Sequence, residues 1–99
     1  MLIYKIFRAD EYLAFTRQGH SLGAPIDLAD GYIHLSTGEQ LDATLVKHFA
    51  GQTGLMIAEV DLHLLGDAIR WEPARGGELF PHIYAELPIH AVVSLQRRD

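Results

Sequence analysis

The chain has 99 residues, 48% of them apolar, a formal net charge of −5 and no cysteine. This length accommodates one domain, residues 1–99, and the scattered lysines and arginines argue against a surface for long nucleic acid. Without cysteines, disulfides and thiolate-ligated zinc are excluded, and no apolar run reaches the ~20 residues of a membrane span. We therefore expect a cytoplasmic protein that is not inserted in a membrane.

The first third of the sequence predicts one strand, one helix and one loop. Residues 2–7 are rich in β-branched and aromatic side chains, which favours a strand. Asp10 is placed to cap a helix over residues 10–19, which Gly19 would end. Residues 20–31 contain two glycines and a proline and are predicted to form a loop.

A second strand and a second helix follow. Residues 32–35 predict a short strand, and apolar spacing predicts a helix over residues 38–49. Ser36 or Thr37 would cap this helix, and Thr37 with Gln40 fits a capping box. A capping serine has its oxygen occupied by backbone N–H groups, so its sequence position does not favour a serine nucleophile of the Gly-x-Ser-x-Gly type.

The second half of the chain predicts only strands and loops. The expected strands cover residues 54–61, 68–72, 80–85 and 89–96, and the expected loop covers residues 73–79. Pro81 indicates an edge position or a bent entry for its strand. About six short strands and two helices, grouped rather than alternating, predict an α+β fold.

Two of the predicted strands carry an unusual polar face. Because alternate residues of a strand share a face, Tyr32, His34 and Ser36 point one way, and His82 and Tyr84 share a face of their own strand. A solvated sheet face with structural histidines is the plain interpretation. Tyrosine, histidine and serine are nevertheless unusual choices for such a face, so we expect His34, Ser36, His82 and Tyr84 to converge on one cleft.

A metal site is the first alternative for these histidines. Two imidazoles with a carboxylate are a common ligand set for zinc, and the candidate carboxylates are Asp27, Asp30 and Glu72. No spacing matches a metal-binding motif, so no metal is predicted. The remaining histidines are interpreted as surface residues: His20, His48, His63 and His90.

The segment "RWEPARGGELFPH" has features of a binding loop. Burial of Glu72 against Trp71 would raise the pKa of Glu72 and make it a proton carrier. Arg75 and the backbone N–H groups of Gly76 and Gly77 could bind an anion. The plain interpretation is a turn with a surface ion pair between Glu72 and Arg75.

Four segments, "IYKI", "DLADGYIHLSTGEQ", "FAGQ" and "RWEPARGGELFPHIY", resemble the bacterial and plant proteins of the domain of unknown function 952 family. The resemblance covers about residues 2–93. It implies a fold related to the ADP-ribosyltransferases, which is a split, strongly bent β structure around a cleft for a nicotinamide dinucleotide.

The resemblance also implies roles for individual residues. The sequence His34-Leu35-Ser36 matches the His-x-Ser/Thr element that lies against ribose and nicotinamide in that wider group. Tyr84 or Tyr32 would stack on a base. The acidic residue is either Glu72 or Glu86, and this departure from the pattern leaves its identity open.

These observations give two functional hypotheses. The first is an enzyme, a transferase or glycohydrolase that processes NAD, ADP-ribose or 2′-phosphorylated derivatives without a resident cofactor. The second is a non-catalytic module that binds a nucleotide or an acidic metabolite. Homodimerisation through an edge strand is a further option. The predicted catalytic residues are His34, Ser36, Glu72 and His82. The predicted nucleotide-binding residues are Tyr32, Tyr84, Arg75, Gly76 and Gly77.

Overall fold

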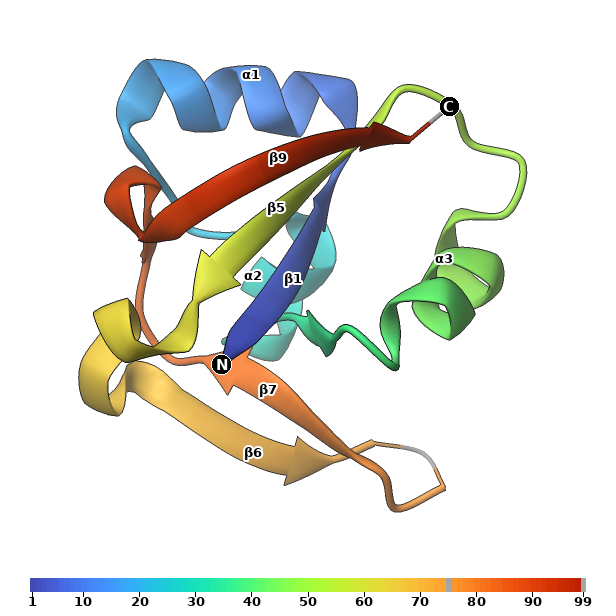
Figure 1. Ribbon diagram of the computed structural model, residues 1–99, viewed down its shortest axis with the longest axis vertical. Helices are drawn as coiled ribbons and strands as arrows, with labels where there is room; N and C mark the ends of the chain where they lie inside the picture. The colour runs from blue at the N-terminus through green and yellow to red at the C-terminus, as the bar shows by residue number, and fades with distance from the viewer. Residues whose placement is uncertain (75, 99) are drawn as a thin grey trace.

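A four-stranded antiparallel sheet forms one half of the computed structural model, which describes residues 1–74 and 76–98 (Figure 1). Its strand order is β4–β1–β5–β9, and β1 pairs with β5 along its whole length. The strands are β4 (Ser36–Thr37), β1 (Leu2–Phe7), β5 (Leu55–Asp61) and β9 (Val92–Arg98).

A three-stranded antiparallel sheet, β3–β7–β6, forms the other half, and a two-stranded sheet joins β2 to β8. These strands are β3 (Ile33–His34), β7 (Leu79–Ile83), β6 (Ile69–Pro73), β2 (His20–Ser21) and β8 (Leu87–Pro88). The helices are α1 (Ala9–Gln18), α2 (Pro25–Asp30) and α3 (Leu41–Phe49), with 3₁₀ turns at Leu62–Ala68 and Ile89–Ala91. The predicted α+β class is confirmed, with three α-helices in the described residues.

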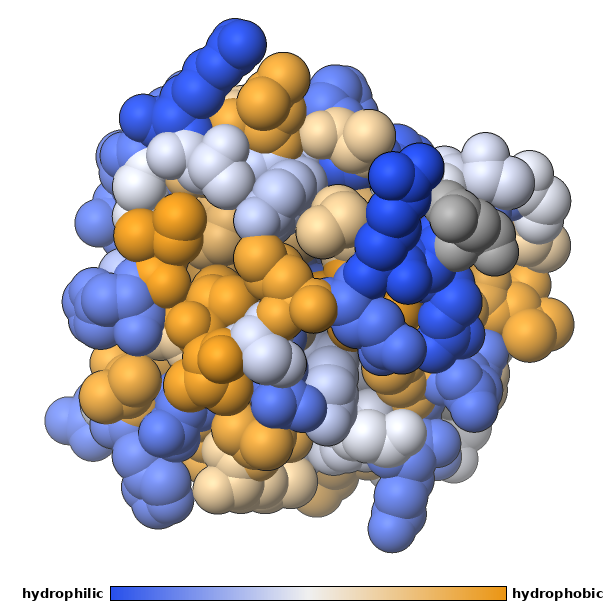
Figure 2. Space-filling model, turned by 45° about the horizontal axis from the view of Figure 1, so that its top comes forward, coloured by the Kyte–Doolittle hydropathy of each residue, from blue (hydrophilic) through white to orange (hydrophobic). Residues whose placement is uncertain are grey.

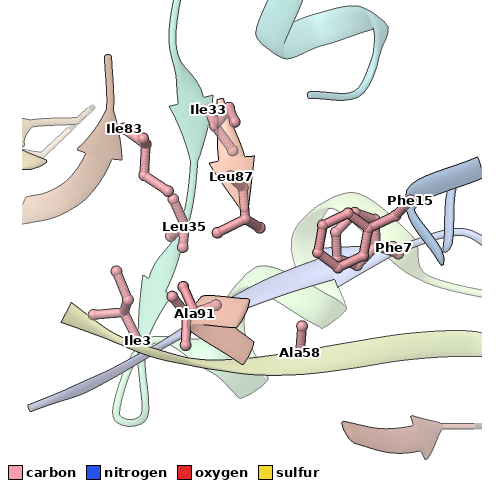
Figure 3. Close-up of a cluster of buried hydrophobic side chains, with 10 residues drawn as sticks. Ile3, Phe7, Phe15, Ile33, Leu35, Ala58, Ile83, Leu87 and Ala91 are labelled. Carbon is pink, nitrogen blue, oxygen red and sulfur yellow. The ribbon is translucent and has the colours of Figure 1, made fainter. Parts of the chain in front are cut away.

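The main core lies between the two larger sheets (Figure 3). Ile33 and Ile83 of the three-stranded sheet belong to the same buried cluster as Ile3 of β1, and Phe7 and Phe15 extend that cluster beneath α1. The rings of Phe7 and Phe15 are stacked with centroids 5.0 Å apart. Burial of such side chains is the main source of folding free energy, so both sheets are held in place by one core.

A smaller core lies on the other face of the four-stranded sheet, where Leu41 and Leu45 of α3 pack against Ile6 and Ile57. Outside these cores, Figure 2 shows apolar side chains gathered near the centre of one face and bordered by charged ones. No helix among residues 1–74 and 76–98 combines the length and the apolar character that crossing a membrane requires.

The predicted loop at residues 20–31 is wrong, because the segment contains β2 and the helix α2. Pro25 occupies the first turn, where its missing N–H is no loss. The Asp27 carboxylate accepts the backbone N–H of Ala24 at 2.7 Å, and Gly31 ends the helix with a φ of 88°. These are ordinary helix signals, but six residues are too few for a recognisable apolar period.

The predicted strand at residues 32–35 is shorter in the structure, where it is β3 (Ile33–His34), and a second strand, β4, begins at Ser36 in another sheet. His34 pairs with β7, whereas Ser36 pairs with Tyr4 of β1, and the chain crosses from one sheet to the other at Leu35. The N–H of Leu35 donates to the carbonyl of Pro81 at 3.1 Å. Pro81 therefore lies in the central strand of its sheet, so the predicted edge position is wrong.

The predicted capping interactions are partly correct. Thr37 and Gln40 exchange reciprocal backbone-to-side-chain hydrogen bonds of 3.0 and 3.2 Å, as the capping box requires, although α3 begins at Leu41. The predicted cap by Ser36 is wrong, since its Oγ lies 3.1 Å from the hydroxyl of Thr44. Asp10 does not precede its helix, which begins at Ala9.

Replacement of Gly23 by alanine is expected to cost about 1–3 kcal/mol more than replacement of Gly19, because overpacking adds to backbone strain. Gly23 has a φ of 110°, and a Cβ there would lie 2.5 Å from the Cβ of Asp27. Gly19 also has a positive φ, 79°, but a Cβ there meets nothing within 4 Å. Urea unfolding of both variants measures the difference, and equal losses would contradict the steric argument.

Candidate functional site

Asp27 connects three elements through four short contacts. Its side chain is fully buried, and Oδ1 accepts the ring Nδ1–H of His34 at 2.6 Å and the backbone N–H of His34 at 3.1 Å. Oδ2 accepts Lys5 Nζ and the N–H of Ala24, both at 2.7 Å. Asp27 therefore joins β1, α2 and β3 and fixes the orientation of the His34 ring.

The pKa of Asp27 reflects this environment. Burial by itself raises the pKa, but the hydrogen bond from His34, the charge and hydrogen bond of Lys5 and the N–H of Ala24 outweigh burial and hold the pKa at about 2. Asp27 is therefore ionised at neutral pH and acts only as a hydrogen-bond acceptor.

His34 contacts a carboxylate at each ring nitrogen. Nδ1 contacts Asp27, and Nε2 lies 3.0 Å from Oδ2 of Asp30, the last residue of α2. Because an ionised carboxylate only accepts hydrogen bonds, the Nδ1 contact with Asp27 requires a proton on Nδ1. The Nε2 contact with Asp30 is an ion pair when the ring is charged. The geometry around His34 therefore suits the imidazolium form. The His34 side chain is 36% exposed.

His82 contacts a carboxylate at one nitrogen only. Its Nδ1 lies 2.7 Å from Oε1 of Glu72, which also accepts the hydroxyl of Tyr84 at 2.7 Å. The hydrogen bonds from His82 and then Tyr84 lower the pKa of Glu72, while the contact with Glu72 raises the pKa of Tyr84. The predicted rise in the pKa of Glu72 against Trp71 is wrong, because adjacent strand residues point to opposite faces.

The rings of Tyr32, His34, His82 and Tyr84 form one group, which we call the ring cluster. Tyr32 is stacked on His82 with centroids 4.2 Å apart, and its centroid lies 4.7 Å from His34 and 5.2 Å from Tyr84. The two imidazole centroids are 5.4 Å apart. Direct pairing of His34 with His82 across β3 and β7 explains the convergence, because opposed residues of an antiparallel pair share a face.

Arg70 is a site residue that the sequence analysis missed. It lies opposite His82 in β6, and its guanidinium is 5.2 Å from the centroid of the Tyr84 ring. Its position two residues before Glu72 was the available signal, since such residues share a strand face. The positive charges of Arg70 and Lys5 balance two of the three negative charges on Asp27, Asp30 and Glu72. A protonated His34 would balance the third, so that these six side chains together carry no net charge.

Other predicted site residues lie elsewhere. Ser36 is buried against α3, and no interaction of its side chain with the ring cluster is found in the described structure. Gly76 and Gly77 lie in the turn between β6 and β7, where the N–H of Gly77 donates to Ala74 and is not free for a pyrophosphate. Arg75 lies outside the described residues.

Glu86 does not reach the ring cluster. The strand β7 ends at Ile83, so Glu86 does not continue the face of Tyr84, and its carboxylate lies 3.9 Å from Nε2 of His20. Glu72 is therefore the carboxylate that contacts His82. The catalytic role of either glutamate stays a prediction.

No group of three His, Asp or Glu side chains in the described parts of the chain is arranged to hold a metal ion. A surface groove of about 300 Å³ lies elsewhere, against α1 and residues 20–25, and its lining includes Phe15 and His20. None of the ring-cluster residues lines that groove.

Replacement of Tyr84 by phenylalanine is expected to raise the pKa of Glu72 toward its ordinary value, because one of the two hydrogen bonds that stabilise its carboxylate is lost. An NMR titration of the Glu72 side-chain carboxyl carbon measures the change. Tyr4→Phe is the matched control, since the hydroxyl of Tyr4 donates to Glu59. An unchanged Glu72 titration in Tyr84→Phe would contradict the assignment.

The fold and the site define a small α+β domain with paired histidine–carboxylate contacts on one sheet. The chain belongs to the family described as protein of unknown function (DUF952), whose model matches residues 6–95. No curated protein matches the chain. The matched family carries no ADP-ribosyltransferase description, and that likeness stays a prediction.

Solved structures of one bacterial protein are similar to the whole chain. The crystal structure of protein CC0527 from Caulobacter crescentus has 43% sequence identity and a TM-score of 0.96, covering 100% of this chain and 87% of that one. The solution NMR structure of CC0527 gives 44% identity and a TM-score of 0.86, covering 97% of this chain and 83% of that one.

Proposed function

We propose that this protein is an enzyme that acts on a small nucleotide, such as NAD or an ADP-ribose or 2′-phosphorylated derivative, at the ring cluster. The observation that carries the proposal is the contact between Glu72 and Nδ1 of His82. The lowered pKa of Glu72 keeps it ionised, so Nδ1 carries a proton, and in the neutral ring Nε2 is the nitrogen with the lone pair. A histidine oriented by a carboxylate in this way is suited to acid–base catalysis.

The free nitrogen of His82 is accessible. No buried side-chain nitrogen or oxygen in the described structure lacks a hydrogen-bond partner, and no partner of His82 Nε2 is found there. Nε2 therefore reaches solvent, although the side chain as a whole is only 7% exposed.

Two neighbouring side chains support a nucleotide as the ligand. Tyr84 is 43% exposed, which leaves ring surface for a base, whereas Tyr32 is already stacked on His82. Arg70 supplies a fixed positive charge on the same face, as recognition of a phosphate requires. An ADP-ribosyl or 2′-phosphoryl transfer uses these groups, with His34 and His82 at the reacting atoms.

The binding part of this proposal is tested by thermal unfolding with NAD, ADP-ribose, adenosine 2′-phosphate and adenosine. The phosphate-bearing ligands are expected to raise the melting temperature, by linkage, more than adenosine does. Tyr84→Ala and Arg70→Ala are expected to reduce the shift. Arg17→Ala is the charge-matched control, because Arg17 lies in the last turn of α1 and is not part of the ring cluster. The absence of any shift at millimolar ligand would contradict the proposal.

A non-catalytic module that binds a nucleotide or an acidic metabolite is the second candidate. It is favoured by the double hydrogen bonding of Glu72, which leaves this carboxylate partly engaged within the protein. Incubation of the protein with each ligand that binds, followed by chromatography of the products, separates the two. Tight binding with no product at any pH favours the module.

A further inference from the structure

The two histidines of the ring cluster differ in which nitrogens are free. We propose that His82 is the general base and His34 the general acid in cleavage of a phosphate diester attached to a nucleoside, with Glu72 and Asp27 as positioning residues. This inference rests on the proposed function and narrows its substrate class. It assigns opposite proton-transfer roles to two side chains whose ring centroids are 5.4 Å apart.

The role of His82 follows from its single carboxylate contact. Glu72 accepts a hydrogen bond from Nδ1–H at 2.7 Å, so Nε2 of the neutral ring is the nitrogen that can remove a proton from water. Tyr32, stacked at 4.2 Å, and the hydrogen bond of Tyr84 to Glu72 limit movement of this pair.

The role of His34 follows from its two carboxylate contacts. Asp27 and Asp30 together favour a proton on each ring nitrogen, which is the state of a general acid. Asp27 is fully buried and fixed, whereas the Asp30 side chain is 41% exposed at the end of α2. A substrate oxygen can therefore take the place of the Asp30 carboxylate beside Nε2 without disturbing the Asp27 contact.

The pairing of one acid with one base selects the substrate class. Nicotinamide leaves NAD by taking the bonding electron pair onto its ring nitrogen, and it needs no proton. An alkoxide that leaves phosphorus is strongly basic and does need one. Arg70, directly opposite His82 in β6, supplies positive charge for the phosphate. A phosphate diester therefore uses every group on this face.

These roles define one step, hydrolysis of the phosphate diester by water. Water forms a bond to phosphorus while one of its protons passes to Nε2 of His82. The bond from phosphorus to the ribose oxygen breaks, its electron pair goes to that oxygen, and the oxygen takes the proton from Nε2 of His34. The products are a phosphate monoester and a ribose hydroxyl, which belong to one molecule when the diester is cyclic. Proton exchange with solvent restores the two histidines.

Two probe substrates separate the acid from the base. Adenosine 2′,3′-cyclic phosphate has a basic ribose alkoxide as its leaving group, whereas the p-nitrophenyl ester of thymidine 5′-phosphate releases a weakly basic phenolate. We expect His82→Ala to lower kcat/KM about 100-fold or more for both probes, and His34→Gln to do so only for the cyclic phosphate. Gln at position 34 retains an amide that can donate to Asp27.

The pH profile gives a second readout that does not depend on a variant. His34 faces the carboxylates of Asp27 and Asp30 and the rings of Tyr32 and His82. His82 faces Glu72, Tyr32 and His34, with Arg70 directly opposite it in β6. Activity on the cyclic phosphate is expected to rise with pH as the base loses its proton and to fall again as the acid does. With the nitrophenyl ester, activity is expected to show no fall at alkaline pH, because its leaving group needs no proton. This comparison uses the unsubstituted protein, so it does not depend on whether His34→Gln folds.

The outcomes distinguish this inference from the proposed function. Nucleotide binding without cleavage of either diester, or release of nicotinamide from NAD with both diesters intact, overturns the phosphate diester assignment and leaves the proposed function standing. Failure of every nucleotide to bind overturns both. Equal loss of both probe activities in a folded His34→Gln variant removes the acid role, whereas selective loss of cyclic phosphate cleavage supports it.

Discussion

Replacement of Asp27 by asparagine is expected to lower the free energy of unfolding by about 3–5 kcal/mol, because it leaves a buried charge without its partner. The Lys5 side chain is only 6% exposed, and its Nζ lies 2.7 Å from the Asp27 carboxylate. Asparagine has nearly the same shape, so the loss reports the charge and the hydrogen bonds that the carboxylate accepts, and not a cavity. Urea unfolding followed by circular dichroism measures it.

Two variants control for other causes of this loss. Asp30→Asn removes a carboxylate that also contacts His34, but at the surface, where ion pairs contribute only about 0–1 kcal/mol. Lys5→Met combined with Asp27→Asn removes both members of the buried pair and should cost less than Asp27→Asn alone. A loss in Asp30→Asn as large as in Asp27→Asn would contradict the buried-pair argument.

The free energy of unfolding is expected to fall in acid as the Asp27 carboxylate takes up a proton. The pKa of Asp27 is lowered in the folded protein from 3.8 to about 2, so the unfolded chain binds the proton more readily. Its contribution of about 2 kcal/mol is therefore fully present above about pH 4 and is lost as the pH falls through about 2. Asp27→Asn should abolish this part of the pH dependence of stability.

Replacement of Glu72 by glutamine is expected to lower turnover about 10²–10⁴-fold while nucleotide binding persists, if the protein is the proposed enzyme. Glutamine keeps the shape of the side chain but not the charge that holds the proton on Nδ1 of His82. Glu86→Gln is the matched control, since that carboxylate faces His20 instead. Single-turnover rates with saturating substrate, together with calorimetric binding, measure the two effects separately.

Two results would count against this role of Glu72. Parallel loss of binding and turnover in Glu72→Gln would make it a ligand-binding residue rather than a positioning residue for His82. An equally large effect of Glu86→Gln would indicate that neither carboxylate acts at the ring cluster specifically.

The parts of the fold that follow a clear period could be predicted from the sequence. The strand β1 has the expected range, α1 begins and ends one residue earlier than expected, and α3 begins three residues later. Each has a regular apolar pattern or a glycine stop. The helix α2 was missed because its six residues expose Ile26 and Leu28 and bury Asp27. Its stability comes from tertiary contacts that local patterns do not contain.

The site was predictable to the extent that strand alternation determines it. The alternation of side chains along a strand predicts that His82 and Tyr84 share one face and that Tyr32 and His34 share another, without knowledge of the strand pairing. It could not show that the chain changes sheets after His34, so Ser36 was wrongly included. The contact of Lys5 with Asp27 joins elements 22 residues apart, and no local rule finds it. Arg70 could have been found by the same alternation, since it lies two residues before Glu72.

The crossing of the chain between sheets at Leu35 restricts how this family of sequences can change in length. His34 is held in register by β7 and Ser36 by β1, with a single residue between them. One inserted residue would turn an apolar side chain of one sheet outward and shift the pairing of the other. The turn at residues 76–78 is exposed and lies at the end of a hairpin, where an insertion disturbs neither core. Length variation among relatives should therefore accumulate at that turn and be excluded from residues 33–37.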